Sequence, residues 1–333
     1  MKLPTYLSDL NDILEWIDID LDGTLRFKGE ILLTVEKEIP LESNLLHNLT
    51  NLLYGRCYTR SNGSKENKEP EDDSSILSLL REANTSAELF DGGWQVDEIE
   101  SSGNIRVRKG GYKRYTFAGD FLREHFGQGA LKKNELVKIK AYPEYFGEEG
   151  NEGIFYYVFG STMYESNQMM IARLYFHVKP ECAADLVRYI TSEFNRFSIP
   201  FQFKCLNNAS LYTRSDAAVL YLEKRYVNFV FDLLQASINT VSPWLNESIP
   251  MFTFPLAKGI GFAENPFSSD ESFGSNRCRI VAQGILNAWK EKLPKTDWME
   301  SILQHIRKSF LIPEAFYLNP NSHYPYSFSL LEN

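Results

Sequence analysis

The sequence predicts an α+β fold, in which a helical N-terminal region is followed by a mixed, largely antiparallel sheet with packed helices. Three observations support this class. Apolar residues recur at helical spacing near the start, short alternating segments follow between Gly and Pro residues, and later helices and strands do not strictly alternate. We expect an N-terminal region over residues 1–150 and a second domain over residues 151–333.

The N-terminal region begins with two predicted helices. Apolar residues at helical spacing indicate one helix from Tyr6 to about Trp16 and another from Leu41 to Leu53, with a short strand at residues 31–39 between them. Residues 60–75, RSNGSKENKEPEDDSS, are polar and charged, so they cannot bury enough apolar surface to become ordered. The sequence therefore predicts a mobile loop at residues 60–75.

The centre of the chain is predicted to be rich in strands. After a short helix around Ile76 to Ala83, alternating segments are separated by Gly and Pro: GWQVDEIES, GNIRVRKGGYKRYTF, LVKIKAYP and GIFYYVFG. A peptide could add a strand to an open edge of such a sheet, or bind along the basic segment RVRKGGYKRY. We interpret the N-terminal region as a docking region for substrate or partner.

The C-terminal half is predicted to begin with a strand, a turn and a helix, followed by further strands. RLYFHVKP is a strand, and Pro180 begins a helix through PECAADLVRYITSEFNRF. Two more strands, IPFQFKCLN and AAVLYLEK, precede the helix VNFVFDLLQASI. PLAKGIGFAENPFSSDESFG is then expected to be a long loop, and Ser275 is expected to cap the last long helix.

Composition limits the classes of function. The 333 residues carry a formal charge of −9, which argues against a nucleic-acid binder that works by general attraction to phosphates, so any anion site must be built locally. The four cysteines form no CxxC pair, and the N-terminus lacks the apolar run of a signal peptide or membrane span. We therefore expect a reduced, cytoplasmic protein that does not act on membranes or nucleic acid and has no metal site.

One strand raises the possibility of a site. In RLYFHVKP, Leu174 and Phe176 point to one face, whereas Arg173, Tyr175 and His177 point to the other. The simplest interpretation is a solvated outer face. If the strand holding Lys204 lies beside this one, however, Arg173, Tyr175 and Lys204 converge on one side of the sheet.

Further basic residues could join this convergence. Arg214 lies just ahead of the next strand, on which Tyr221 lies farther along, and Arg277 and Arg279 follow the helix start near Ser275. Arginines present paired donors to phosphate oxygens, whereas a lysine can also lose its proton and act as a base. Such a collection would suit a phosphate dianion.

Each of these residues also has an ordinary structural interpretation. Lys204 could extend from a sheet to water, Tyr175 and Tyr221 could be half-buried rings with a solvated hydroxyl, and His177 could be a surface group. Arg277 and Arg279 could form a solvated helix turn, although cations near a helix N-terminus oppose the dipole and call for an anion. The DLDGT segment near the N-terminus is interpreted as an acidic turn, because no apolar strand precedes it.

Three blocks of the C-terminal half resemble the HopA-type family, named after a type III secretion effector of plant-pathogenic bacteria. The blocks are RLYFHVKPECAADLVRYITSEFNRFSIPFQFKCLN, YTRSDAAVLYLEKRY and PLAKGIGFAENPFSSDESFGSNRCRIVAQGIL, and the resemblance covers roughly residues 150 to 310. Related domains serve as lyases in class V lanthipeptide biosynthesis. The resemblance thus implies a lyase of this kind over residues 151–333.

A more distant similarity is to phosphothreonine lyases. Arg173 stands at their first basic position, Tyr175 at their acid histidine and Lys204 at their strand lysine, which acts as general base. The resemblance implies that Arg214, together with Arg277 and Arg279, holds the phosphate, with Tyr221 nearby. Because a tyrosine replaces the acid histidine, the leaving group would be protonated by Tyr175, by His177 or not at all.

The resemblance therefore implies a lyase that eliminates phosphate from phosphoserine or phosphothreonine in a precursor peptide. No metal or organic cofactor is required, because a kinase activates the leaving group beforehand. The implied partners are the phosphorylated precursor peptide and its phosphotransferase. The rival hypothesis is a non-catalytic effector or phosphopeptide-binding protein of the same fold, and the tyrosine at the acid position is its best support.

Overall fold

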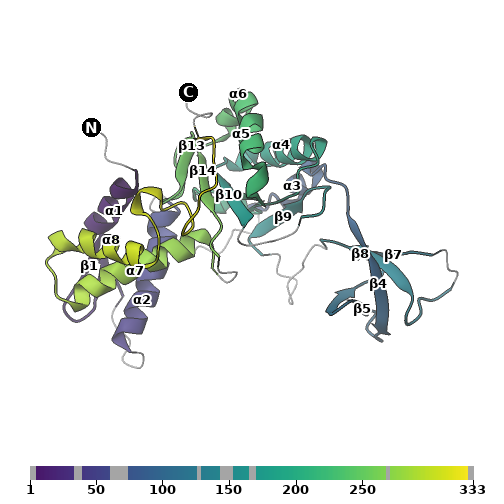
Figure 1. Cartoon of the computed structure of the whole chain (residues 1–333), viewed down its shortest axis with the longest axis horizontal. Helices are drawn as coiled ribbons and strands as arrows, with labels where there is room; N and C mark the ends of the chain where they lie inside the picture. Colours follow the sequence, from purple (N-terminus) through teal and green to yellow (C-terminus); the bar gives the residue numbers. More distant parts are fainter. Residues whose placement is uncertain are drawn as a thin grey trace.

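The computed structural model describes residues 5–33, 40–60, 74–125, 129–142, 153–164, 170–267 and 271–328. Helices and antiparallel sheets coexist in it, so the predicted α+β class with a helical start is confirmed (Figure 1). Most of the predicted mobile loop at residues 60–75 lies outside the described residues. The four cysteines are free thiols.

A six-stranded antiparallel sheet organises the molecule. Its strand order is β13-β14-β10-β12-β11-β9. The strands are β9 (Phe155–Phe159), β10 (Ile171–Phe176), β11 (Phe201–Leu206), β12 (Ala218–Glu223), β13 (Phe254–Ala257) and β14 (Ile260–Glu264). The expected long loop at residues 255–274 is wrong in its first half, because β13 and β14 form a hairpin there and β14 pairs with β10. Its Gly and Pro residues obscured the strand pattern, and Gly259 has a positive φ of 67° in the turn.

Helices cover both faces of this sheet. On one face lie α3 (Leu77–Ala83), α4 (Ala183–Arg196) and α5 (Lys224–Ala236), and α6 (Ile238–Val241) follows α5. The opposite face is covered by α1 (Thr5–Trp16), α2 (Leu41–Leu52), α7 (Phe273–Lys290) and α8 (Trp298–Lys308). Strands β10 and β14 therefore carry buried side chains on both faces, whereas β9 and β11 have half-buried or exposed side chains on the second face.

The N-terminal helices match the sequence periodicity closely, and a π-helix η1 (Leu53–Tyr58) continues α2. A small sheet of β1 (Ile17–Ile19), β2 (Leu25–Phe27) and β3 (Glu30–Leu33) follows α1. Asp20 accepts from Arg26 within the β1–β2 turn, which agrees with the acidic turn expected for DLDGT. No helix in the described ranges has the length and apolar content required to cross a bilayer.

A second sheet of five strands lies apart from the helices (Figure 1). Its order is β6-β5-β4-β8-β7, and its strands are β4 (Phe90–Ile99), β5 (Ile105–Lys109), β6 (Tyr112–Thr116), β7 (Phe121–Arg123) and β8 (Leu136–Lys140). It has its own small core around Trp94, Val96 and Val107. Three of the four segments expected in the strand-rich centre form this separate sheet, whose outer strands are β6 and β7, whereas the fourth, GIFYYVFG, contains β9 of the central sheet.

A buried carboxylate fixes the end of β14. Glu264 is fully buried and accepts hydrogen bonds from Lys224 Nζ at 2.7 Å, Ser322 Oγ at 2.6 Å, the Asn319 amide at 2.8 Å and the Tyr326 hydroxyl at 2.8 Å. These contacts join β14, the start of α5 and the C-terminal segment. A buried ion pair of this kind is costly to break, because the remaining charge has no partner.

We predict that Gly284→Ala destabilises the protein. A Cβ at Gly284 in α7 would lie 2.6 Å from Ile302 Cα in α8, so the two helices would have to separate. The expected loss is about 1–3 kcal/mol in the free energy of unfolding, measured by denaturant titration. Gly55→Ala is the matched control, because nothing lies within 4 Å of its added Cβ. Equal stability of the two variants would contradict the close α7–α8 contact.

We also predict a pH effect of Glu264→Gln. Burial opposes the charge of Glu264, but its donors, Lys224 first, outweigh burial and hold its pKa below the ordinary 4.5. A depressed carboxyl pKa stabilises the fold above pH 4.5, and this contribution is lost as the pH falls through the folded-state pKa. The variant should lose about 3 kcal/mol at neutral pH and show a flatter acid dependence in thermal unfolding. Parallel acid profiles of variant and wild type would disprove this role of Glu264.

Candidate functional site

The predicted site residues are distributed over three neighbouring strands. The condition that the strands of Arg173 and Lys204 are neighbours is not met, since β12 lies between β10 and β11. Register nevertheless places the side chains on one face. Arg173 is opposite Tyr221, while Tyr175 and Lys204 are both opposite Val219. The sheet therefore brings Arg173, Tyr175, Tyr221 and Lys204 together, with β12 as the bridge.

Arg173 is a buried cation. Its side chain is only 8% exposed, so the expected solvated outer face is wrong at this position. The Nε atom donates to Asn265 Oδ1 at 2.6 Å, and the guanidinium carbon lies 4.9 Å from the Tyr221 ring centroid. No carboxylate pairs with Arg173 in the part of the chain that the structure describes. A buried charge without a counter-ion is unfavourable, so this arginine is suited to receiving an anion.

Tyr175 supplies a buried hydroxyl beside this arginine. The residue is 2% exposed, and its hydroxyl makes no hydrogen bond of normal geometry to the described residues, although Arg173 and Tyr58 lie close enough to it to affect its pKa. The expected half-buried ring with a solvated hydroxyl is therefore wrong. The ring centroids of Tyr58 and Phe273 lie 6.5 Å and 6.3 Å from that of Tyr175 and enclose it. Burial raises the pKa of Tyr175 to about 12, although the Arg173 charge opposes this. At neutral pH the hydroxyl keeps its proton and can only donate a hydrogen bond or accept one.

Lys204 stands at the more open end of the cluster. It is half-buried, and its Nζ lies 4.1 Å from the Phe155 ring centroid and 5.9 Å from that of Tyr221. No carboxylate pairs with Lys204 within the described ranges. Arg173 and Lys204 thus contact the same tyrosine ring, and neither cation is neutralised by the protein there.

The N-terminal region contributes residues that sequence reasoning missed. Tyr58 in η1 is fully buried against Tyr175, and Tyr54 stacks on Tyr58 with ring centroids 5.5 Å apart. Their close packing against α7 requires Gly274, because a Cβ there would lie 2.5 Å from the Tyr58 ring. In the sequence these tyrosines look like ordinary members of an apolar helix face, and no local signal distinguishes them.

Arg214 reaches the cluster indirectly. Its guanidinium pairs with Asp216 at 2.8 and 2.9 Å and donates to the Tyr54 hydroxyl at 3.3 Å. Through Tyr54 and Tyr58 it is connected to Tyr175. Unlike Arg173, however, Arg214 already has a carboxylate partner, so it would bind another anion only by exchanging Asp216.

His177 is buried as well, which corrects the expectation of a surface group. Its Nδ1 lies 3.0 Å from the Ser248 carbonyl oxygen and 2.9 Å from Ser248 Oγ. Burial lowers the pKa of His177, so the ring is neutral at neutral pH. A neutral ring held by Ser248 is poorly suited to donate a proton to a leaving group.

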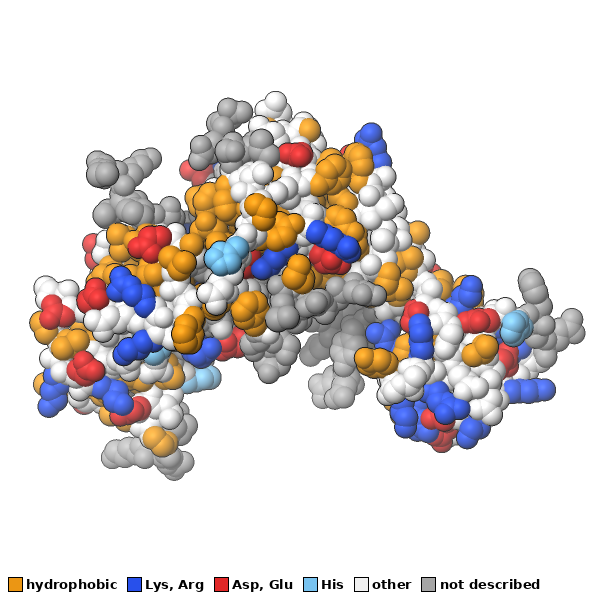
Figure 2. Space-filling view, viewed as in Figure 1, with side chains coloured by type: hydrophobic (Ala, Val, Ile, Leu, Met, Phe, Trp, Pro, Cys, Tyr) orange, Lys and Arg blue, Asp and Glu red, His pale blue; other side chains and the backbone are white. Residues whose placement is uncertain are grey.

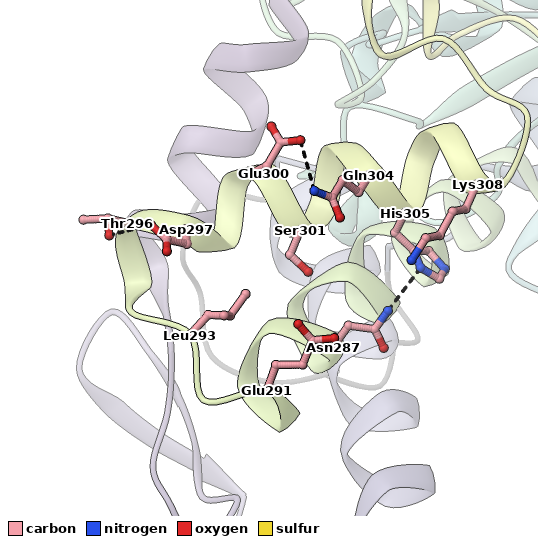
Figure 3. A pocket seen from close by; sticks show the side chains of 10 residues that line it. All are labelled: Asn287, Glu291, Leu293, Thr296, Asp297, Glu300, Ser301, Gln304, His305 and Lys308. Carbon is pink, nitrogen blue, oxygen red and sulfur yellow. Dashed lines mark hydrogen bonds between the residues drawn. The ribbon is translucent and has the colours of Figure 1, made fainter.

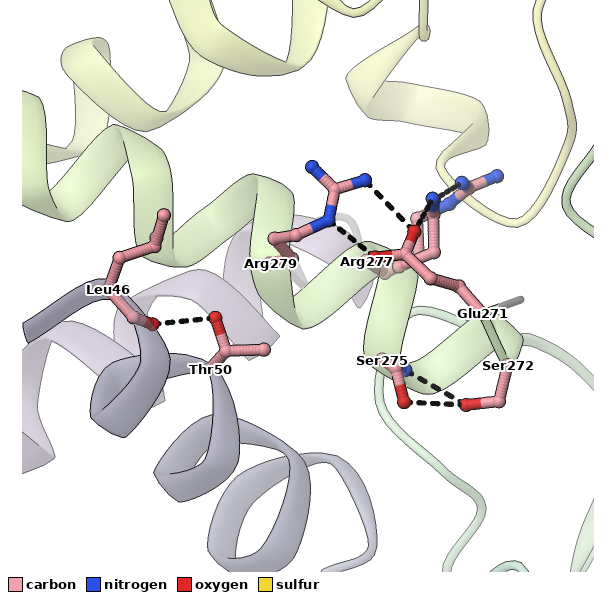
Figure 4. A network of polar contacts seen from close by, with 8 residues as sticks. Leu46, Thr50, Glu271, Ser272, Ser275, Arg277 and Arg279 are labelled. Carbon is pink, nitrogen blue, oxygen red and sulfur yellow. Dashed lines mark hydrogen bonds and ion pairs between the residues drawn. The ribbon is translucent and has the colours of Figure 1, made fainter. Parts of the chain in front are cut away.

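The start of α7 differs from expectation in two respects (Figure 4). Ser272, not Ser275, is the N-cap, and its Oγ accepts from the Ser275 amide at 3.1 Å. Arg279 pairs with Glu271 at 2.6 Å, and Arg277 is buried with its guanidinium donating to the Phe316 and Leu318 carbonyls. Both arginines are therefore occupied by other groups, and neither is placed at the Arg173 cluster by a direct contact.

A cavity of about 430 Å³ lies elsewhere, between α7 and α8 (Figure 3). Its lining contains none of the predicted site residues. It includes the carboxylates of Glu291, Asp297 and Glu300 and only one lysine, Lys308. This balance of charges is unfavourable for a phosphate, so the candidate site remains the cluster around Arg173.

Comparison with known proteins gives a family. The sequence pattern of the HopA1 effector protein family matches residues 149–318, and no curated protein matches. One similar solved structure is the effector protein from Pseudomonas syringae pv. tomato strain DC3000, with 14% identity, 84% of this chain and 98% of that chain covered, and a TM-score of 0.47. Another is the effector protein from Pseudomonas syringae pv. syringae strain 61, with 17% identity, coverages of 47% and 59%, and a TM-score of 0.36.

We predict that Tyr175→Phe leaves the stability of the ligand-free protein unchanged or raises it. The lost hydroxyl makes no hydrogen bond of normal geometry to the described residues, so its removal relieves a desolvation cost. Tyr212→Phe is the matched control, because the buried Tyr212 hydroxyl donates to the Leu206 carbonyl at 2.6 Å and its loss should cost about 1–2 kcal/mol. Thermal unfolding measures both. A loss in Tyr175→Phe as large as in Tyr212→Phe would show that its hydroxyl is satisfied.

Proposed function

The chain belongs to the HopA1 effector protein family, and on that basis we propose that it is a lyase that eliminates phosphate from phosphoserine or phosphothreonine in a peptide. The observation that carries the proposal is the buried Arg173, which has no carboxylate partner in the described part of the chain and lies beside the unpartnered Tyr175 hydroxyl. A phosphate would supply the missing counter-ion and an acceptor for the hydroxyl.

In the proposed reaction Lys204 Nζ, in its neutral form, takes the proton from the α-carbon of the phosphorylated residue. The electrons of that bond form the double bond between Cα and Cβ, and the Cβ–O bond breaks so that phosphate leaves with its electron pair. The products are a dehydroamino acid and inorganic phosphate. Lys204 suits this role because no ion pair holds its Nζ among the described residues and because it contacts the same ring as Arg173.

Arg173 and Tyr175 would act on the leaving group. The guanidinium would neutralise charge that develops as the Cβ–O bond breaks. A phenol whose pKa is about 12 is a weak acid, so Tyr175 would stabilise the departing phosphate by hydrogen bonding more than by transferring its proton. Tyr221 would hold Arg173 in place through its ring, and Arg214 would join only by exchanging Asp216.

The proposed substrate is a precursor peptide phosphorylated by a partner kinase. No metal or organic cofactor enters this reaction scheme, because phosphorylation has already provided the leaving group. The alternative function is non-catalytic binding of a phosphopeptide. The high pKa of Tyr175 favours this alternative, because it removes the proton donor that a histidine would supply. Both functions require phosphate at Arg173, and only the first requires turnover.

We predict that wild-type protein converts a phosphoserine or phosphothreonine peptide to a product lighter by one phosphoric acid, and that Lys204→Ala does not. Mass spectrometry of the incubated peptide detects the loss directly, and deuterium at the α-carbon should slow it if proton removal limits the rate. Removal of the base should slow elimination about 100-fold or more, because general base catalysis contributes at least that factor to the rate. Lys258→Ala is the matched control, since Lys258 is exposed in the β13–β14 turn.

Binding must be measured alongside turnover. Peptide that binds wild type but keeps its phosphate would establish the non-catalytic alternative. Elimination by Lys204→Ala at the wild-type rate would contradict the assignment of Lys204 as the base. The same rate in Arg173→Gln would contradict the phosphate site itself.

A further inference from the structure

The five-stranded sheet has a basic surface that the proposed lyase site does not use. Residues 90–140 contain ten Lys and Arg against seven Asp and Glu, whereas the whole chain has a formal charge of −9. The rest of the protein is therefore strongly acidic. In Figure 2 Lys and Arg side chains gather on the lower side of the right-hand lobe, which this sheet forms in Figure 1. An anionic partner would be repelled elsewhere and attracted here.

The cations of the β5–β6 hairpin are arranged unfavourably unless an anion joins them. Lys113 lies directly opposite Arg108, and Arg108 is opposite Gln95 on β4. Arg108 donates to the Gln95 side chain at 2.7 Å, and neither Arg108 nor Lys113 forms an ion pair with a carboxylate within the described sheet. Like charges directly opposite each other destabilise a pair of strands.

A neighbouring arginine on the same surface, Arg106, is neutralised by carboxylates. Arg106, two residues before Arg108, forms ion pairs with Asp97 at 2.9 Å and with Glu98 at 2.5 Å. Arg108 and Lys113 form no ion pair of this kind among the described residues, although Lys113 lies close enough to Asp97 to help lower the pKa of that carboxyl. Lys138 is exposed on the same face, two residues along β8 from Leu136, which pairs with Gln95. It also forms no ion pair with a carboxylate among the described residues.

The edge of the sheet adds a site for a peptide backbone. β6 is the terminal strand, so one side of its backbone is unpaired within the described sheet. Tyr112 is 78% exposed and Tyr115 is 53% exposed along it. An exposed edge strand with aromatic side chains is a surface to which an extended peptide can pair through main-chain hydrogen bonds.

We infer that the outer face of the β5–β6 hairpin, around Arg108 and Lys113, is a docking site for an acidic segment of an extended polypeptide. A peptide fits better than a nucleic acid. A strand can use the β6 edge, and the small excess of positive charge gives few phosphate contacts, whereas nucleic-acid binding relies on many. This site goes beyond the lyase proposal, because it needs neither a phosphate on the peptide nor turnover.

The test uses the full chain and a fluorescein-labelled, unphosphorylated peptide with Glu at alternate positions. Fluorescence anisotropy should show binding that weakens as salt is raised, and the double variant Arg108→Glu/Lys113→Glu should lower the affinity about 10-fold or more. The matched control is Arg188→Glu/Lys292→Glu, which makes the same change of charge at exposed positions outside the sheet and should bind like wild type. Thermal unfolding confirms that both variants are folded.

Several results would overturn the inference. They are an unchanged affinity in the Arg108/Lys113 variant, an equal loss in the control variant, and equal binding of a peptide with Lys in place of Glu. A single-stranded oligonucleotide that binds more tightly than the acidic peptide through the same two residues would replace the peptide with a nucleic acid. Because the probe carries no phosphate, failure here leaves the elimination assay unaffected, and failure of elimination leaves this assay unaffected.

Discussion

The burial of Arg173 on a strand covered on both faces is the constraint on which the rest of the site depends. Helices cover both faces of the central sheet, so a charged residue on β10 cannot reach bulk water as it would on a solvated face. The protein gives Arg173 an amide oxygen, a tyrosine ring and, among the described residues, no carboxylate. A buried cation that has no carboxylate partner among the described residues is suited to binding an anion.

Several distant segments cooperate to hold this arrangement. Asn265, which orients Arg173, follows Glu264 directly, and its carbonyl accepts from Asn319 Nδ2 at 2.6 Å. The Glu264–Lys224 ion pair therefore fixes the strand end from which Arg173 is oriented. On the other side, Tyr58 from the N-terminal region and Phe273 from α7 enclose Tyr175. The candidate site is thus built by both halves of the chain and not by the C-terminal half alone.

Local patterns in the sequence were enough to predict many elements and the shared face of Arg173 and Tyr175 on β10, whereas Lys204 was placed on that face only on the condition that its strand is adjacent. Period-2 alternation identifies which side chains share a face, and helical spacing identifies α1, α2 and α4. Strand order is not encoded locally, so the insertion of β12 between β10 and β11 could not be predicted. The same limit applies to burial. Arg173 looks solvated in the sequence because the helices that cover it lie far away along the chain.

The ion-pair and hydrogen-bond partners of the predicted site residues could not be predicted from the sequence either. Nothing near Arg214 in the sequence distinguishes Asp216 as an ion-pair partner from an ordinary surface carboxylate, and the contact of Arg277 with the Phe316 and Leu318 carbonyls joins segments about forty residues apart. The hairpin of β13 and β14 was missed because Gly and Pro residues commonly indicate a loop. Family resemblance, by contrast, rested on three separated blocks and is confirmed over residues 149–318.

The most direct test of the account is the stability of the protein as a function of phosphopeptide concentration, in wild type and in Arg173→Met. A ligand that binds only the folded state stabilises it by about 2.7 kcal/mol at one hundred times its Kd. The account predicts this rise for wild type and for Arg279→Met, whose guanidinium is already held by Glu271, and no rise for Arg173→Met. The same rise in Arg173→Met would contradict the claim that Arg173 is the anion-binding residue.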